Sequence, residues 1–230
     1  MVLEACIENL EELDYAEKKG FDRVELCTAL SQGGLSPSYS FIKKACKSKV
    51  VEVHVMIRPR GGYFRYSNSE LKLMKKEISI AKKLGAKGVV LGCLNENDEL
   101  AFENQTLIHH ARSVGLEVTY HRAFDLIKNK FEALQLLISW GVKRVLTSGG
   151  GRTAMEGLDV IQELQKRFGD QIEIMAGSGI HGNNIQFFKA ALIPAVHFSI
   201  GQADVKLPLG FGYNRSLDRE KVEAILDQIN

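Results

Sequence analysis

One pattern recurs along almost the whole chain: a short run rich in β-branched residues, followed by an amphipathic helical pattern that ends in glycine. A glycine just after a helix favours the left-handed conformation that commonly terminates helices. The phrase Gly-x-x-strand then opens several units, at residues 20–24, 85–89 and 141–145. Strands separated by helices pair in parallel, because each crossover returns the chain to the same edge of the sheet. The repeat therefore predicts an α/β fold.

Eight strand–helix units favour a closed barrel over an open, doubly wound sheet. The expected strands are Val2–Glu8, Asp22–Cys27, Val50–Ile57, Lys87–Gly92, Leu116–Arg122, Arg144–Thr147, Glu173–Ala176 and Ala195–Ile200. The expected helices lie near Asn9–Lys19, Ser38–Lys47, Ser69–Leu84, Glu103–Ser113, Phe131–Ser139, Thr153–Phe168, Asn183–Ala190 and Asp218–Gln228. A dinucleotide-binding sheet would need a glycine-rich turn after its first strand, and residues 7–10 contain no glycine. We predict a single (β/α)8 TIM barrel, one domain over residues 1–230.

The composition excludes several classes of partner. The 230 residues carry a formal net charge of +2, which predicts neither a nucleic-acid partner nor an anionic membrane surface. No apolar run approaches the roughly 18 residues of a membrane span. Strand-like residues begin at Val2, which leaves no room for a signal peptide. We therefore expect a cytoplasmic protein whose four cysteines remain thiols.

Strand alternation predicts which side chains point into the barrel, since every second residue shares a face. In the third strand Val53 and Val55 belong to an apolar set that suits packing against helices. The opposite sets are polar. They are Glu4 and Cys6 in the first strand, Glu25 and Cys27 in the second, Glu52, His54, Met56 and Arg58 in the third, and Thr119 and His121 in the fifth. We expect these polar sets to face the interior, where the carboxyl ends of barrel strands carry catalytic residues.

Two pairs on the first two strands suggest chemistry. Glu4 and Glu25 can form a carboxylate pair with one raised pKa for general acid catalysis; the alternative is structural pairing with the side chains Arg58, Arg122 or His54. Cys6 and Cys27 stand at similar places on the same strands, and soft sulfur ligands select Cu(I), with Met56 as an additional thioether. The alternative is that both thiols only pack in the core.

The later strands end in polar and glycine-rich segments. His121, Arg122 and Asp125 together are typical of anion binding or proton transfer, although a structural network explains them equally well. The turn Gly177-Ser178-Gly179 follows the seventh strand, where barrels often bind phosphate, so it predicts a phosphate or carboxylate site or else only a tight turn. His54 and His197 are interpreted as core histidines. Residues 58–68 and 201–217 are the least regular and should lie over the barrel mouth.

Several longer phrases resemble a known family. Residues 53–62 read VHVMIRPRGG, residues 119–125 read TYHRAFD, residues 144–149 read RVLTSG, and the segment 23–27, RVELC, precedes SQGG at residues 31–34. In these phrases the chain resembles the CutC-type copper homeostasis proteins, in register from Val2 to about Gly201. The resemblance implies a TIM barrel, a cytoplasmic location, homo-oligomers and a role in copper homeostasis, with copper-binding cysteines matching Cys6 and Cys27. It also implies a shared pocket containing Glu4, Glu25, Arg58, His121, Arg122 and Asp125.

Two functional hypotheses follow, and neither needs an organic cofactor. In the first, Cys6 and Cys27 bind Cu(I) for buffering or delivery. In the second, the protein is an isomerase or lyase-like enzyme acting on a small anionic or phosphorylated metabolite. Arg58, Arg122 and the turn at residues 177–179 would then hold the anion, and the proton-transferring groups would come from Glu4, Glu25, His121 and Asp125. A third possibility is a scaffold whose oligomer contacts matter more than its pocket.

Overall fold

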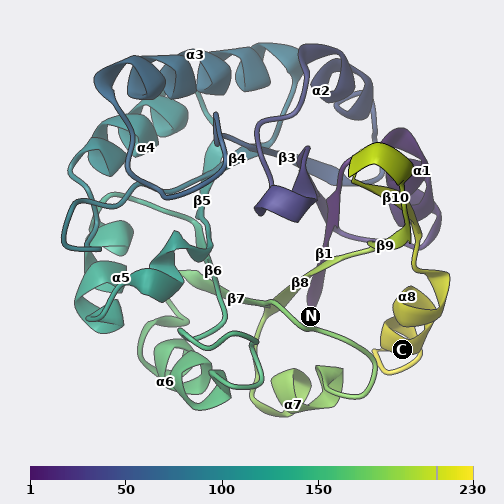
Figure 1. Ribbon diagram of the computed structural model, residues 1–230. Coiled ribbons are helices and arrows are strands. Elements are labelled where there is room, and N and C mark those ends of the chain that lie inside the picture. The colour runs from purple at the N-terminus through teal and green to yellow at the C-terminus, as the bar shows by residue number, and fades with distance from the viewer. Residues whose placement is uncertain (211, 230) are drawn as a thin grey trace.

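The expected alternation of strands and helices is present in the computed structural model, which describes residues 1–210 and 212–229 (Figure 1). The barrel strands are β1 (Val2–Ile7), β2 (Arg23–Leu26), β3 (Glu52–Met56), β4 (Gly88–Leu91), β5 (Glu117–Tyr120), β6 (Arg144–Thr147), β7 (Glu173–Gly177) and β8 (Ala195–Ser199). The helices are α1 (Leu10–Lys18), α2 (Tyr39–Ala45), α3 (Asn68–Leu84), α4 (Glu103–Ser113), α5 (Lys130–Ser139), α6 (Leu158–Phe168), α7 (Ile185–Ala190) and α8 (Arg219–Leu226). Short 3-10 turns are η1 (Leu30–Gln32), η2 (Arg122–Leu126) and η3 (Pro208–Gly210).

The eight strands close into one parallel barrel in chain order, and β8 pairs with β1. The helices surround this barrel, as Figure 1 shows in a view along its axis. The prediction of a single (β/α)8 barrel is therefore confirmed. One helix boundary was wrong: α6 begins at Leu158, not Thr153. The preceding segment turns instead, and Gly157 packs so closely on the Ser148 carbonyl that no side chain would fit there.

Local signals define the ends of the helices. Ser67 and Glu70 form a reciprocal capping box at the start of α3, which satisfies backbone N–H groups that have no partner inside the helix. The same helix ends at Gly85, whose φ of +99° is the left-handed conformation that glycine adopts without steric cost. Throughout residues 1–210 and 212–229, no helix is both long and apolar enough to cross a membrane.

A buried ion network fills the amino-terminal end of the barrel. Arg23 donates to Glu173 Oε1 at 2.8 Å and also pairs with Glu4. Arg144 donates to the same Glu173 oxygen at 3.1 Å and to Glu117 at 2.6 Å. Both guanidinium groups are almost fully buried, so their charges are tolerated only because carboxylates face them. This network supports the polar site above it from inside the barrel.

The segment 201–217, expected to be irregular, is an antiparallel hairpin of β9 (Gly201–Lys206) and β10 (Tyr213–Leu217). Residues 202–206 are all exposed, so the apolar alternation that reveals a half-buried strand is missing from this sequence. Arg215 anchors the hairpin by donating to Glu12 of α1 at 2.8 Å and to Ser199 at 2.5 Å. The hairpin consequently lies beside α1 at the barrel mouth (Figure 1).

Replacing Glu173 by glutamine should destabilise the protein by about 3 kcal/mol, because two buried arginines lose a shared counter-charge. Urea unfolding at pH 7 measures the change. The matched control is Glu163→Gln, which breaks only the exposed pair with Arg167 and should cost less than about 1 kcal/mol. Equal losses in the two variants would show that the internal network does not stabilise the barrel.

Candidate functional site

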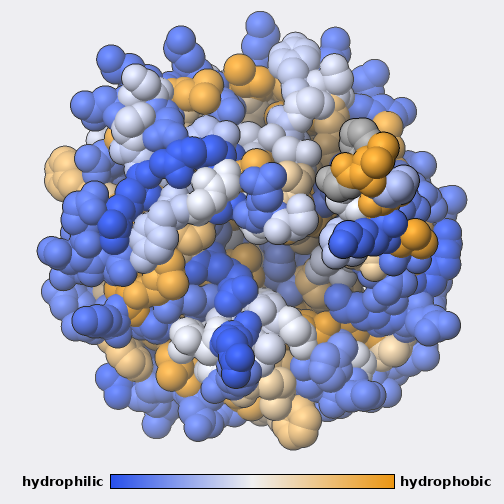
Figure 2. Space-filling view, viewed as in Figure 1, coloured by the Kyte–Doolittle hydropathy of each residue, from blue (hydrophilic) through white to orange (hydrophobic). Residues whose placement is uncertain are grey.

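A cavity of about 660 Å³ opens where the carboxyl ends of the strands meet. The molecular surface is hollowed over the barrel centre in the orientation of Figure 1 (Figure 2). Its walls come from the strands and also from the loops and hairpin at the mouth, which contribute Phe64, Gly179 and Arg215. This is the end of the barrel at which (β/α)8 enzymes place their active sites.

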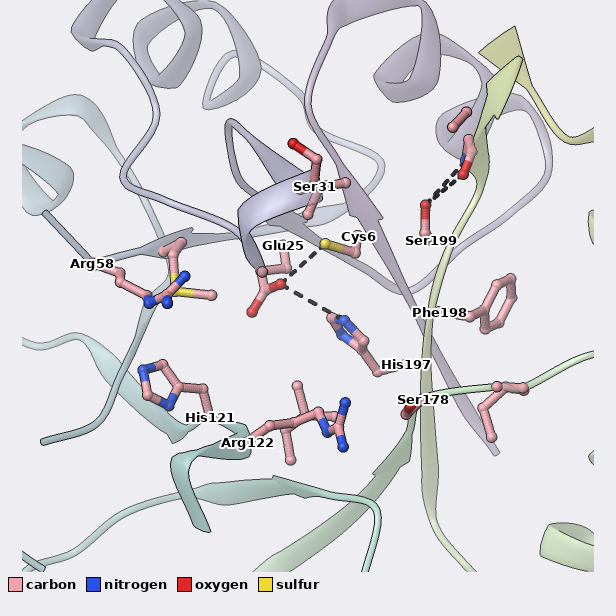
Figure 3. Close-up of a pocket in the computed structure, with 18 of the residues that line it drawn as sticks. Cys6, Glu25, Ser31, Arg58, His121, Arg122, Ser178, His197, Phe198 and Ser199 are labelled. Atoms are coloured by element: carbon pink, nitrogen blue, oxygen red, sulfur yellow. Dashed lines mark hydrogen bonds and ion pairs between the residues drawn. The ribbon is translucent and has the colours of Figure 1, made fainter. Parts of the chain in front are cut away.

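Two thiols and a carboxylate, those of Cys6, Cys27 and Glu25, lie together on the inner face of β1 and β2. Figure 3 shows Cys6 and Glu25 side by side at the cavity. Cys6 is directly opposite Glu25 in the strand register, and Cys27 follows the end of β2 on the same face. Glu25 Oε2 lies 3.2 Å from Cys6 Sγ and 3.3 Å from Cys27 Sγ, and the two sulfur atoms are 3.8 Å apart. Gly34 allows the next loop to close over Cys27, since its Cβ position is 3.0 Å from that sulfur.

His197 is a site residue that the sequence analysis interpreted as part of the core. It lies on β8 directly opposite Glu4, and its Nδ1 is 2.7 Å from Glu4 Oε1. Its Nε2 is 3.7 Å from Glu25 Oε2 (Figure 3). The imidazole therefore bridges the two carboxylates. The alternation of β8 places His197 inward, but only the pairing of β8 with β1 reveals its neighbours.

The two carboxylates have opposite pKa shifts. Burial raises the pKa of Glu4, but the hydrogen bond with His197 and the Arg23 charge outweigh burial and hold it well below its usual value. Burial and the adjacent Cys6 raise the pKa of Glu25 well above its usual value. Burial opposes the charge on His197, but Glu25, Cys6 and Glu4 together raise its pKa well above the ordinary range. The two carboxylates beside His197 therefore differ in acidity, with the pKa of Glu4 lowered and that of Glu25 raised.

The two thiols also differ. The hydrogen bond with Cys27 lowers the pKa of Cys6 to about 5, with His197 and Glu25 acting in the same direction against burial. Burial and the proximity of Cys6 raise the pKa of Cys27 well above its ordinary value. Cys6 is therefore the thiolate of this cluster at neutral pH. Thiolates are the nucleophilic and metal-binding form of cysteine.

Neither glutamate pairs with Arg58, Arg122 or His54. The ion-pair partners of Glu4 are Arg23 and His197. Arg58 lies across the cavity. Its guanidinium donates instead to the backbone carbonyls of Gln32, Gly34 and Gly62. His54 is buried deeper in the barrel near Arg144, and burial lowers its pKa to about 3. The structural ion pairs of Glu4 are therefore formed with Arg23 and His197, and not with Arg58, Arg122 or His54 as expected.

The His-Arg-Asp segment after β5 divides between two environments. His121 lines the cavity, and burial lowers its pKa to about 3, so the imidazole is neutral. Arg122 also lines the cavity, while its guanidinium donates to Asp125 and Ser148 at 2.8 and 2.9 Å. Asp125 faces the β6 loop, where it accepts hydrogen bonds from Thr147, Ser148 and the Gly150 backbone. Asp125 therefore positions Arg122 and the loop.

The turn after β7 contributes only part of its sequence to the cavity. Ser178 and Gly179 line it, whereas Gly177 is buried at the end of the strand. Ser178 has a φ of +85°, a left-handed conformation that is strained for a residue other than glycine. Its hydroxyl donates to the Arg152 carbonyl at 2.8 Å, which holds the turn in place.

Three groups of potential metal-ligating atoms occur among residues 1–210 and 212–229. They are Cys6 with Glu25 and Cys27, Glu4 with Glu25 and His197, and Glu52 with His54 and Glu117. Only the first contains sulfur, and Met56 packs in the same small apolar cluster as its two cysteines. The sequence expectation of a thiol pair is therefore compatible with the geometry, while Cys46 and Cys93 belong to none of these groups.

The fold and the cavity define a (β/α)8-barrel protein with a thiol–carboxylate site at the carboxyl ends of its strands. The chain matches the CutC family over residues 1–202 and belongs to that family. A family protein CutC from Glaesserella parasuis serovar 5 is 42% identical over 200 residues, covering 86% of this chain and 82% of the relative. A human protein named copper homeostasis protein cutC homolog is 41% identical over 186 residues, covering 80% of this chain and 67% of that one.

Solved structures agree with this assignment. A CutC protein from Streptococcus agalactiae has a TM-score of 0.78 and 33% identity, covering 86% of this chain and 97% of that one. Thiamine phosphate pyrophosphorylase from Pyrococcus furiosus has a TM-score of 0.62 at 12% identity, covering 99% and 95% of the two chains. The second likeness shows the barrel fold alone.

Iodoacetamide should alkylate Cys6 faster than Cys46 at pH 7, because burial raises the pKa of Cys46 to about 11. Since the thiolate reacts, the rate at Cys6 should fall as the pH drops through about 5 and change little between pH 7 and 9. Peptide mapping by mass spectrometry after timed labelling measures both rates. A rate at Cys6 that still climbs tenfold between pH 7 and 8 would contradict the lowered pKa.

Proposed function

We propose that the protein binds Cu(I) through Cys6 and Cys27 and buffers or delivers it in the cytoplasm. The observation that carries this proposal is the 3.8 Å separation of two buried sulfur atoms, of which that of Cys6 belongs to a residue lining the cavity. Membership of the CutC family supports a role in copper homeostasis. The direct binding of copper by this chain is our own inference from the donor set.

The donor set favours a soft monovalent ion. Thiolate and thioether ligands select Cu(I), and Cys6, Cys27 and Met56 lie in one cluster. Metal–sulfur bonds of about 2.3 Å, as in zinc thiolate sites, can span sulfur atoms 3.8 Å apart without moving the strands. Cys6 is already a thiolate, so only Cys27 must release its proton when the ion binds.

Cellular location and assembly form part of the same proposal. All four cysteines are free, and a reducing cytoplasm would keep the pair at the cavity base as thiols. We also propose that the protein forms homo-oligomers, which the family resemblance implies. The exposed side chains Val205, Leu209 and Tyr213 on the hairpin offer apolar surface for such an assembly.

Anaerobic titration of the reduced protein with Cu(I), against a competing chromophoric chelator, tests the proposal. We expect one tightly bound ion per chain. The Cys6→Ser/Cys27→Ser variant should lose this binding, because both soft ligands are removed. Cys46→Ser is the matched control and should keep it, since Cys46 lies outside the ligand cluster. Retention of tight binding by the double variant would refute the proposal.

A second candidate function is proton-transfer catalysis of the isomerase or lyase type on a small anionic metabolite. The observation favouring it is the arrangement of Glu4, His197 and Glu25, which separates the pKa values of two carboxylates. Such separation is how active sites obtain an acid and a base from one residue type. Glu25, whose pKa burial raises, faces the cavity and would be the proton donor.

This candidate is tested by incubating the metal-free protein in D2O with a panel of small hydroxy acids, keto acids and their phosphate esters. Proton NMR would detect deuterium entering a carbon–hydrogen bond of a turned-over compound. We expect Glu25→Gln to lower this exchange by at least about a hundredfold, in the range that general acid–base catalysis contributes. Exchange that is unchanged in the variant would remove Glu25 from the mechanism.

A further inference from the structure

Arg58 is a buried cation without a carboxylate partner. Its side chain is only 4% exposed, and among residues 1–210 and 212–229 no acidic group forms an ion pair with it. The Phe64 ring lies 5.0 Å from the guanidinium carbon and compensates the charge only in part. Buried charges in proteins are normally paired, so an unpaired guanidinium in a cavity wall favours an anionic ligand.

The hydrogen bonds of Arg58 leave two of its five N–H donors available, one on Nε and one on Nη2. Nη1 donates to the carbonyl oxygens of Gln32 and Gly34 at 2.8 and 2.9 Å, and Nη2 donates to that of Gly62 at 2.8 Å. These bonds fix the plane of the guanidinium. Nε is buried and has no hydrogen-bond partner among the described residues. Arg58 therefore presents a rigidly held guanidinium in the cavity wall whose Nε has no partner of its own within residues 1–210 and 212–229.

The imidazole of His121 supplies a further N–H donor that has no hydrogen-bond partner among the residues that the structure describes. Its Nδ1 accepts a hydrogen bond from the Ala123 backbone N–H at 3.2 Å, so the proton of the neutral ring resides on Nε2. Nε2 is buried without a partner in the described part of the chain. The absence of a side chain at Gly92 leaves room for the imidazole, because a Cβ there would lie only 2.6 Å from the ring.

The two donors belong to one wall of the cavity. Phe64 packs against both, with its ring centroid 4.8 Å from that of His121 and 5.0 Å from the Arg58 guanidinium carbon. Figure 3 shows Arg58 and His121 on one side of the cavity and Glu25 between them and His197. Glu25 Oε1 is likewise buried without a hydrogen-bond partner in residues 1–210 and 212–229. Three polar atoms without a partner in the described structure therefore belong to side chains that line the same cavity.

We propose that this space binds a small hydroxycarboxylate, with its carboxylate on Arg58 Nε and His121 Nε2 and its hydroxyl on Glu25 Oε1. A carboxylate has the single negative charge that matches one guanidinium. A phosphate group carries a charge of about −1.5 to −2 at pH 7, which is more than one guanidinium beside a neutral imidazole balances. The site requires no copper, and it would supply a substrate class for the second candidate function while binding can be measured without turnover.

Racemic lactate is the probe, lactamide is its neutral isostere, and inorganic phosphate tests the other anion class. The metal-free, reduced protein is titrated with each while the His121 ring nitrogens are followed by NMR. Lactate should shift the Nε2 signal and bind at least about tenfold tighter than lactamide, since a hydrogen bond to a charged group is involved. No shift, equal binding of lactamide, or a shift with phosphate alone would overturn the proposal.

Substitutions of the two donor residues test where lactate binds. Arg58→Gln and His121→Phe should each weaken lactate binding at least about tenfold. Arg152→Gln is the charge-matched control and should bind normally, because its side chain is 94% exposed and outside the cavity. His121→Phe keeps an aromatic ring against Phe64, so it tests the donor even if Arg58→Gln fails to fold. Normal lactate binding by a folded His121→Phe variant would overturn the proposal, whatever the result of the Cu(I) titration.

Discussion

The fully buried Glu4 carboxylate connects the two polar regions inside the barrel. One oxygen pairs with Arg23, which belongs to the ion network at the amino-terminal end, and the other lies 2.7 Å from His197 at the base of the cavity. The hydrogen bond with His197 is the largest cause that lowers the pKa of Glu4, and the same bond adds to the effects of Glu25 and Cys6 that raise the pKa of His197. The orientation of His197, and through it the environment of Glu25 and Cys6, depends on this interaction.

The sequence predicts the fold and the inward-facing residues because both follow from periodicity. Strand alternation alone places Glu4, Cys6, Glu25 and Cys27 inside the barrel. The neighbours of each side chain depend on how the strands are staggered around the barrel, which periodicity does not encode. For this reason His197 was interpreted as a core residue, although the register places it opposite Glu4.

The hydrogen-bond partners of Arg58 could not be predicted from periodicity either. Its position at the end of β3 correctly indicates a cavity residue, but three backbone carbonyls from loops satisfy most of its donors. Loop conformations of this kind carry no repeating pattern in the sequence. The exposed hairpin at 201–217 was missed for a related reason, since a strand with no buried face shows no alternation.

The hairpin also lies at the limit of the family match, which ends at residue 202. Beyond that point the chain still supplies Ala203, Arg215 and Lys221 to the cavity wall, while Cys6 and Glu25 come from the first two strands. This part of the rim is thus encoded far from Cys6 and Glu25 in the gene. Substitutions in the rim can alter what enters the cavity while the ion network that holds the barrel together remains intact.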